Sequence, residues 1–202
     1  MARAAFKPGA IDPAIAKSFA DRWRRKLFDG WQPQEREHIY VPLQGRVREQ
    51  RSFQAYSPVE MVTHALSHAQ GREVIATLHP NELYSDADLD ALKATGVRLE
   101  HGQMQRFLPG AAVVVTHASS APFNGYFSGK PTILYGRIDF HHIALDVHTL
   151  GVAVAFEQSQ SHTPDFDRYL FWFWQRRLIN AGHPTAEERI RAAMARAGWT
   201  LT

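Results

Sequence analysis

Residues 74–80 read Val-Ile-Ala-Thr-Leu-His-Pro, an apolar run that ends in a histidine and a proline. Residues 111–120 repeat this pattern as Ala-Ala-Val-Val-Val-Thr-His-Ala-Ser-Ser. An apolar run without alternation is typical of a strand in a parallel sheet that is covered on both faces. The polar residues then lie at the carboxyl ends of the strands, where open α/β sheets bind ligands. The two runs therefore predict a parallel sheet whose ligand edge carries imidazole and hydroxyl groups, which suit an anionic, phosphorylated small molecule.

Strand and helix patterns alternate along most of the chain. Apolar runs predict strands at residues 39–43, 73–78, 97–100, 111–116 and 131–135. Capping residues, prolines and glycines predict helices between Asp12 and Gly30, between Ser57 and Gly71, over 86–95 and over 122–128. After residue 136 the pattern weakens, and we expect an aromatic-rich helix over 165–180 and a last helix that a capping box at 185–188 opens. The alternation indicates an α/β fold with a Rossmann-like parallel sheet flanked by helices, followed by C-terminal helices.

Composition limits the class of protein. The chain has 202 residues, 45% hydrophobic and 21% charged, so it can bury a substantial core and is not a disordered protein. A net charge of +3 suits a phosphate-bearing ligand but is too small to indicate nucleic-acid binding. The absence of cysteine excludes disulfides and thiolate metal sites. Because we find no signal-peptide pattern and no apolar run of the roughly 20 residues that a membrane span needs, we expect a cytoplasmic protein, and we leave open a peripheral position on the inner membrane.

Polar residues near the predicted strand ends are the candidate ligand-binding residues. A histidine such as His79 can donate a hydrogen bond to a phosphate oxygen, and the neighbouring proline restricts the backbone. Hydroxyl residues before a helix start, such as Ser119 and Ser120, offer side-chain donors beside free backbone N–H groups. The candidates from these patterns are His79, Pro80, His101, Gly102, Thr116, Ser119, Ser120 and Asn124.

Each candidate also has a plain structural alternative. His79 can be an exposed loop histidine, Ser119 or Ser120 can simply cap a helix, and Gly102 can be a turn glycine. The acidic and histidine residues between 139 and 148 match no familiar ligand spacing, so we expect no metal, and we expect no cofactor. The sequence also lacks the Gly-x-Gly-x-x-Gly fingerprint and the Gly-x-Ser-x-Gly elbow, which argues against an ordinary dinucleotide-binding fold and against that type of hydrolase.

The order of the motifs resembles the capsule polysaccharide biosynthesis family. The resemblance covers roughly residues 38–182 and rests on Tyr-Val-Pro-Leu-Gln at 40–44, Ser57, His79-Pro80, Ser119-Ser120, Gly-Lys-Pro at 129–131, Gly136-Arg137 and Leu-Ile-Asn-Ala-Gly at 178–182. Members of that family are retaining Kdo transferases that use CMP-Kdo and have the two-Rossmann-domain fold called GT-B. The resemblance implies that this chain corresponds to the nucleotide-binding half of such a GT-B glycosyltransferase.

The resemblance also implies roles for individual residues. His79 would contact the phosphate of the nucleotide sugar, and Ser119 and Ser120 would bind the same phosphate. Gln44 would lie at the end of the first strand, near the cleft between domains. His101 and Gly102 would lie close to the nucleotide base or ribose. No catalytic acid, base or nucleophile is assigned.

Two departures and the length before the first strand bear on activity. Thr77 stands where the family usually has lysine, and Asn124 stands where it usually has glutamate. We expect an N-terminal helix and linker over residues 1–37, a Rossmann-like nucleotide-binding core over 38–157, and C-terminal helices over 158–202 that pack on the core. Since residues 1–37 are too few for a Rossmann domain, a second chain would supply the acceptor domain.

Two functions therefore stay open. The first is a glycosyltransferase-like protein of capsular or surface polysaccharide biosynthesis that binds a nucleotide sugar of the CMP-Kdo type. The second is a non-catalytic binding or interaction module on the same fold, inactive without an acceptor domain. Nucleic-acid binding rests on charge alone and is the least favoured.

Overall fold

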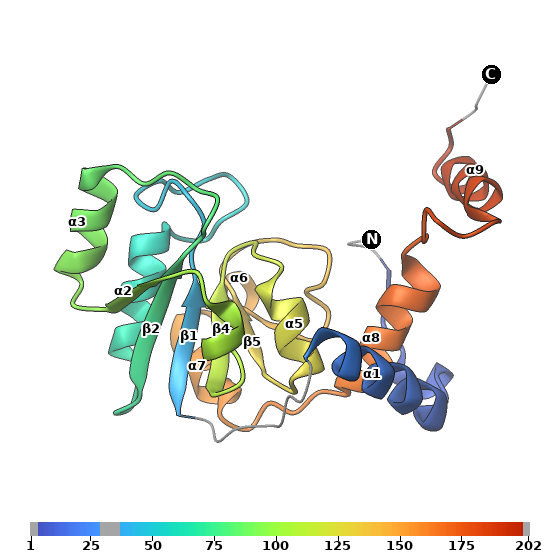
Figure 1. Ribbon diagram of the computed structural model, residues 1–202, viewed down its shortest axis with the longest axis horizontal. Helices are drawn as coiled ribbons and strands as arrows, with labels where there is room; N and C mark the ends of the chain where they lie inside the picture. Colours follow the sequence, from blue (N-terminus) through green and yellow to red (C-terminus); the bar gives the residue numbers. More distant parts are fainter. Residues whose placement is uncertain (1–3, 29–36, 200–202) are drawn as a thin grey trace.

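The computed structural model describes residues 4–28 and 37–199, and a six-stranded parallel sheet forms its centre (Figure 1). The strand order is β3-β2-β1-β4-β5-β6. The strands are β1 (His38–Pro42), β2 (Glu73–Leu78), β3 (Arg98–His101), β4 (Ala111–Thr116), β5 (Thr132–Leu134) and β6 (Leu145–Asp146). The predicted helix stop at Gly30 and all but the last residue of the predicted linker at 31–37 lie outside the described residues.

The order of the strands places a switch of direction between β1 and β4. From β1 the chain adds β2 and β3 on one side, and it then crosses back to add β4, β5 and β6 on the other. Tyr40 of β1 pairs with Ile75 of β2 and with Val114 of β4, so β1 has a neighbour on each side. This is the order of the doubly wound dinucleotide-binding folds, which bind ligands at the switch. The prediction of a Rossmann-like parallel sheet flanked by helices is confirmed.

Helices cover both faces of the sheet. On one face α2 (Pro58–Ser67) and α7 (Val152–Ser159) pack over the main core, and α3 (Asp86–Ala94) lies beside α2. On the other face α4 (Met104–Phe107) covers a second core and α5 (Ala121–Phe127) a third. Both faces of the central strands are therefore covered, and every residue of β1 and β4 is buried, which explains why the two strands are mostly apolar.

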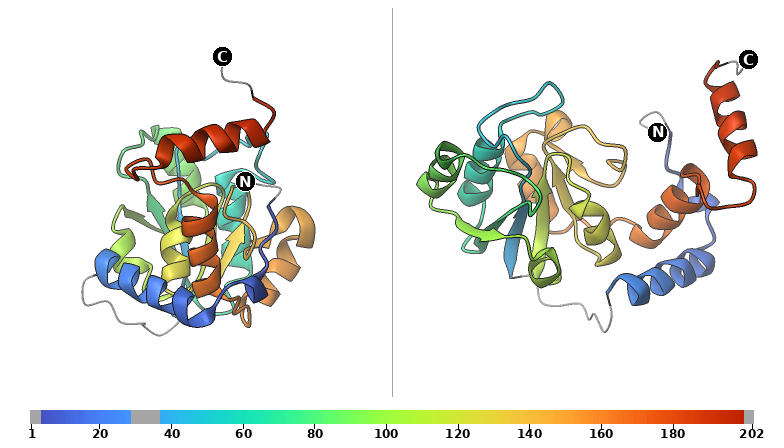
Figure 2. Two further views of the ribbon diagram at one scale, coloured as in Figure 1. Left: turned by 90° about the vertical axis from the view of Figure 1, so that its right-hand side faces the viewer. Right: turned by 45° about the horizontal axis from the view of Figure 1, so that its top comes forward.

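A pair of helices far apart in the sequence lies beside α5. The first helix, α1 (Pro13–Leu27), packs against α8 (Phe166–Phe171), which continues into the π-helical segment η2 (Trp172–Arg177), as Figures 1 and 2 show. Asp12 caps α1 as predicted, because its Oδ1 accepts hydrogen bonds from the N–H groups of Ala14 (2.8 Å) and Ile15 (3.1 Å). Aromatic side chains of α1, α5, α8 and η2 form a common cluster.

Several elements differ from the sequence prediction. The chain past residue 136 is more ordered than its pattern indicated, since it contains β6, α6 (Val147–Leu150) and α7. The short helices η1 (Pro8–Ala10) and α4 were not predicted either.

The last helix, α9 (Ala186–Arg196), is present but starts differently from the prediction. The predicted capping box is wrong, because Thr185 makes no side-chain capping hydrogen bond and its hydroxyl instead pairs with Nδ1 of His183 at 3.0 Å. Figures 1 and 2 show α9 standing away from the sheet.

Candidate functional site

The carboxyl ends of the central strands surround a cavity of about 250 Å³. Its walls come from the ends of β1 and β2, the turn after β3 and the start of α5, so the cavity lies at the switch between β1 and β4. The lining residues are Tyr40, Pro42, Leu43, Thr77, Leu78, His79, Pro80, Gly102, Gln103, Met104, Ser119, Ser120 and Ala121. Open α/β sheets bind ligands at this position, and the volume lies just below the roughly 300–1,000 Å³ of drug-sized ligand sites.

Five of the residues predicted from the sequence meet in this cavity. They are His79, Pro80, Gly102, Ser119 and Ser120, and they come from three separate segments. The imidazole follows β2, and the two hydroxyls lie between β4 and α5; in the sheet order β2 and β4 lie on either side of β1. A ligand in the cavity would therefore meet donors from both sides.

The ring of His79 is held by its own turn. Its backbone N–H donates to the hydroxyl of Tyr84 at 2.9 Å, and its Nδ1 accepts a hydrogen bond from the N–H of Asn81 at 3.2 Å. A ring nitrogen that accepts a hydrogen bond carries no proton, so the proton of the neutral ring lies on Nε2. Among the described residues Nε2 has no hydrogen-bond partner, which leaves it as a donor for a ligand.

The two serines have different roles. Ser119 is buried, and its Oγ accepts a hydrogen bond from the N–H of Ala121 at 3.1 Å, which satisfies the first amide of α5. The next residue, Pro122, has no N–H. Ser120 is exposed, and within the described part of the chain no hydrogen bond involves its hydroxyl. Ligand contacts at this end of the cavity would therefore come from side-chain hydroxyls more than from helix amides.

The floor of the cavity contains two residues that were not among the predicted ligand-binding residues. The hydroxyl of Tyr40 and Oγ1 of Thr77 are 3.0 Å apart, and both side chains are almost fully buried. Burial raises the pKa of Tyr40, so its hydroxyl stays protonated at neutral pH. The aromatic side chain within the predicted strand at 39–43 is the sequence signal that could have identified Tyr40 as a cavity residue.

The turn after β3 contributes two further lining residues. Gln103 has a left-handed backbone with a φ of 59°, directly after Gly102 at 63°, and Met104 begins α4. The N–H of Gly102 donates to the carbonyl oxygen of Leu78 at 2.9 Å, which ties this turn to the end of β2. The polar amide of Gln103 and the thioether of Met104 can contact a planar group such as a base.

Four predicted residues do not line this cavity. The side chain of Thr116 is buried, and its Oγ1 donates to the carbonyl oxygen of Pro42 at 3.3 Å. The side chain of Asn124 reaches the cavity only through Met104, because its Nδ2 donates to Sδ of that lining residue at 3.6 Å. His101 is exposed at the end of β3, and Gln44 lines a separate recess of about 10 Å³ under the loop that follows β1.

His117 also belongs to the β4 polar cluster, but it faces this separate recess. Its Nε2 donates to the carbonyl oxygen of Tyr56 at 2.8 Å, which holds the loop between β1 and α2. Burial lowers the pKa of His117 to about 4. The ring is therefore neutral at pH 7 and holds this loop.

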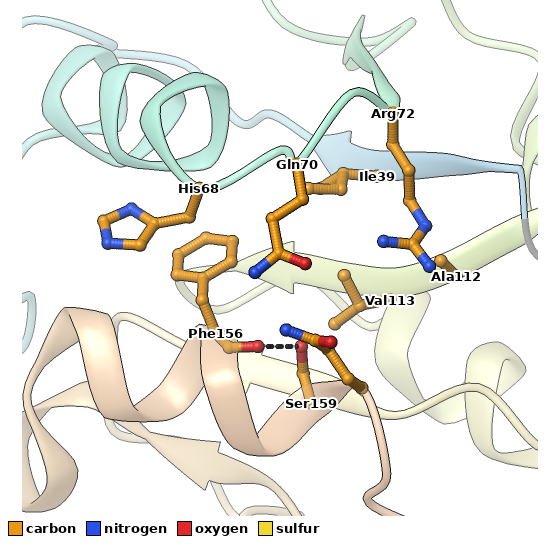
Figure 3. A pocket seen from close by; sticks show the side chains of 9 residues that line it. Ile39, His68, Gln70, Arg72, Ala112, Val113, Phe156 and Ser159 are labelled. Atoms are coloured by element: carbon orange, nitrogen blue, oxygen red, sulfur yellow. Dashed lines mark hydrogen bonds between the residues drawn. The ribbon is translucent and has the colours of Figure 1, made fainter.

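A second hollow lies at the opposite edge of the sheet (Figure 3). His68 stacks on Phe156 with ring centroids 4.9 Å apart, and Ser159 donates to the carbonyl oxygen of Phe156 at 2.7 Å. Its volume of about 40 Å³ has room for one or two water molecules only. The larger cavity at the carboxyl edge is the better candidate for a ligand site.

The candidate cavity combines apolar side chains with a few hydrogen-bond donors. Its described lining contains no Lys, Arg, Asp or Glu, and His79 is the only histidine there. Over residues 4–28 and 37–199, no group of three or more His, Asp or Glu side chains is placed to hold a metal ion. In the same residues no helix combines the length and the apolar character needed to cross a bilayer.

Comparisons with known proteins found likeness at the level of structure and none at the level of sequence families. No protein-family model matches the sequence, and no curated protein matches it. Among solved structures, the chain is similar to "Thermosulfurimonas dismutans KpsC, beta Kdo 2,7 transferase", with 17% sequence identity and a TM-score of 0.48. The match covers 79% of this chain and 52% of that one, so this chain spans about half the length of that protein's structure.

Proposed function

We propose that this chain binds the nucleotide of a CMP-Kdo-type nucleotide sugar in the carboxyl-edge cavity, as the donor-binding half of a glycosyltransferase-like protein of surface polysaccharide biosynthesis. One observation carries the proposal: His79, Ser119 and Ser120 line one cavity at the switch point of a Rossmann-like sheet. The order of sequence motifs that resembles the capsule polysaccharide biosynthesis family gives the proposal its substrate class.

The phosphate would lie between the imidazole and the hydroxyls. Nε2–H of His79 is a donor with no partner among the described residues, and the exposed hydroxyl of Ser120 is another. Ser119 still has its hydroxyl hydrogen to donate, because its oxygen is the acceptor in the bond to Ala121. Donors placed where charge develops on a departing CMP would stabilise that charge.

The nucleoside would lie over the remaining walls. Tyr40 supplies a buried aromatic ring, Met104 a polarizable side chain and Gln103 an amide. Apolar and aromatic walls with a few placed polar groups are the usual lining of nucleotide and cofactor sites. The sugar would extend out of the cavity, since about 250 Å³ is small for a whole nucleotide sugar.

The lining also favours a second candidate function, binding without catalysis by this chain alone. No carboxylate and no permanent cation occur among the described residues that line the cavity, and Thr77 stands where the family that the motifs resemble has lysine. A retaining transfer needs groups on both sides of the donor, so groups from outside this cavity would complete the site. Release of CMP from CMP-Kdo and acceptor by this chain alone supports the enzyme, whereas CMP binding without release supports the binding module.

A thermal-shift panel of CMP, UMP, UDP, GDP and their available sugars tests the proposal. A ligand at about 100 times its Kd adds roughly 2.7 kcal/mol of stability, which raises the melting temperature of a domain of this size by about 5–10 °C. We expect CMP to raise it for the wild type and to lose most of this effect with His79→Ala.

His101→Ala is the matched control, because that histidine is exposed near the same edge but does not line the cavity. CMP should raise the melting temperature of this variant as much as that of the wild type. The proposal fails if none of the nucleotides, tested at concentrations on the order of millimolar, raises the melting temperature of the wild type.

A further inference from the structure

The turn that carries His79 is closed by three hydrogen bonds. The N–H of His79 donates to the hydroxyl of Tyr84 at 2.9 Å, and the N–H of Asn81 donates to Nδ1 of His79 at 3.2 Å. The N–H of Glu82 donates to the carbonyl oxygen of His79 at 3.2 Å and completes the turn. The backbone and the ring of His79 are therefore both held by the six residues 79–84.

Tyr84 connects this turn to the body of the protein. Its half-buried ring packs against the main core. Directly after it, Ser85 caps α3 through a reciprocal capping box with Asp88. Burial raises the pKa of the Tyr84 phenol, so the group that accepts the His79 N–H is a neutral hydroxyl. The turn is thus fixed at one end by β2 and at the other by the tyrosine and the helix cap.

The bond to Nδ1 decides which atom of the ring is offered to a ligand. An isolated neutral imidazole exchanges between two tautomers, but only the form with its proton on Nε2 can accept from the N–H of Asn81. In the opposite tautomer the ring would present a lone pair at Nε2, which repels a phosphate oxygen. The turn therefore selects the tautomer that can donate.

We propose that Tyr84 is a positioning residue that, through the turn at residues 79–82, holds His79 in the Nε2–H tautomer and directs that donor to the cavity. This inference rests on the proposed function, because a phosphate oxygen is the acceptor that Nε2–H would meet. Tyr84 does not line the cavity and acts on the ligand only through His79.

The test measures the tautomer and the binding separately. The protein is labelled with ¹⁵N-histidine, and the ring nitrogens are observed at about pH 8.5, well above the ordinary imidazole range. The His79 signals are those absent from His79→Ala. Tyr84→Phe removes one hydroxyl and keeps the ring, and Tyr56→Phe is the matched control, since among the described residues no hydrogen bond involves the Tyr56 hydroxyl. CMP affinity is measured for the same proteins by calorimetry.

We expect the wild type and Tyr56→Phe to show the Nε2–H form of His79. We expect Tyr84→Phe to show a mixture of both forms and a CMP affinity lower by about three- to tenfold, the effect of one hydrogen bond. A wild-type ring in the Nδ1–H form, or a Tyr84→Phe protein with an unchanged tautomer or an unchanged CMP affinity, overturns the inference. If CMP does not bind the wild type, the proposed function fails, while the tautomers still decide whether Tyr84 sets the state of the ring.

Discussion

The hydroxyl of Tyr40 on β1 and Oγ1 of Thr77 on β2 are 3.0 Å apart at the floor of the carboxyl-edge cavity. Tyr40 is 1% exposed and Thr77 is 4% exposed, so neither hydroxyl can exchange this partner freely for water. The pair gives the buried hydroxyl of Thr77 a hydrogen-bond partner at the end of β2. In this chain the position completes a neutral, hydrogen-bonded floor and carries no charge.

This pair should be measurable as a coupling energy. Thr77→Val leaves the buried Tyr40 hydroxyl without its partner, so we expect a loss of about 1–3 kcal/mol in the free energy of unfolding. Tyr40→Phe should cost a similar amount, and the double variant less than the sum of the two by about 1 kcal/mol. Urea denaturation of the four proteins gives the values. Simple additivity would mean that the hydroxyls do not interact.

Ser119 and Ser120 should separate stability from binding. Ser119→Ala removes the acceptor of the Ala121 N–H and is expected to lower the free energy of unfolding by about 1 kcal/mol. Ser120→Ala should change stability by less than about 0.5 kcal/mol and weaken CMP binding. Chemical denaturation measures the stability of both variants, and calorimetry measures their affinity for CMP. The reverse assignment, with Ser120→Ala destabilising and CMP binding unchanged, would contradict this account.

His117 should give the protein a pH-dependent stability. Burial lowers its pKa to about 4 in the folded state from an ordinary 6.5, so between these values the unfolded chain binds the additional proton. The stabilisation is therefore fully present above pH 6.5 and is lost as the pH falls towards 4, by up to about 3 kcal/mol.

The comparison of His117→Gln with the wild type isolates this effect. Glutamine cannot titrate but keeps an N–H donor for the carbonyl oxygen of Tyr56. The free energy of unfolding is measured by urea denaturation at about pH 7 and pH 4. Between these two pH values it should fall less for His117→Gln than for the wild type, and His101→Gln should lose as much as the wild type. Parallel losses in all three proteins would show that His117 is not the group that titrates.

Arg24 should be required for α1 to remain docked. Its Nε donates to the carbonyl oxygen of Phe127 at 2.6 Å, and its other nitrogens pair with Asp21 and Asp167, so one guanidinium connects α1, α5 and α8. Arg24→Lys keeps the charge but cannot make all three contacts. We therefore expect the free energy of unfolding, measured by urea denaturation, to fall by about 2 kcal/mol. The exposed Arg25→Lys is the control. Equal stability of both variants would contradict the connecting role.

The sequence was most informative where one element carries one clear pattern. The strands predicted at 73–78 and 111–116 coincide with β2 and β4, because buried parallel strands need continuous apolar residues. β6 escaped prediction because two residues, Leu145 and Asp146, carry no periodicity. α7 begins Val-Ala-Val-Ala, which has no helical period, and its packing over β5 and β6 determines its state.

The same limit applies to the candidate site. The meeting of His79 with Ser119 and Ser120 could be predicted because the carboxyl ends of parallel strands share one edge. The displacement of Gln44 and Thr116 from the cavity could not, since it depends on which side of the backbone each side chain takes. The contacts of Asn81 and Tyr84 with His79 join a side chain to a backbone group within one turn, and no spacing of residue types indicates them.

Calorimetric titration with CMP of the wild type, His79→Ala and His101→Ala tests the central claim most directly. We expect CMP to bind the wild type and His101→Ala with equal affinity, and His79→Ala to bind at least about tenfold more weakly, as loss of a hydrogen bond to a charged phosphate requires. Absence of heat with the wild type, or binding to His79→Ala that equals the wild type, would contradict a nucleotide site at the carboxyl edge of this sheet.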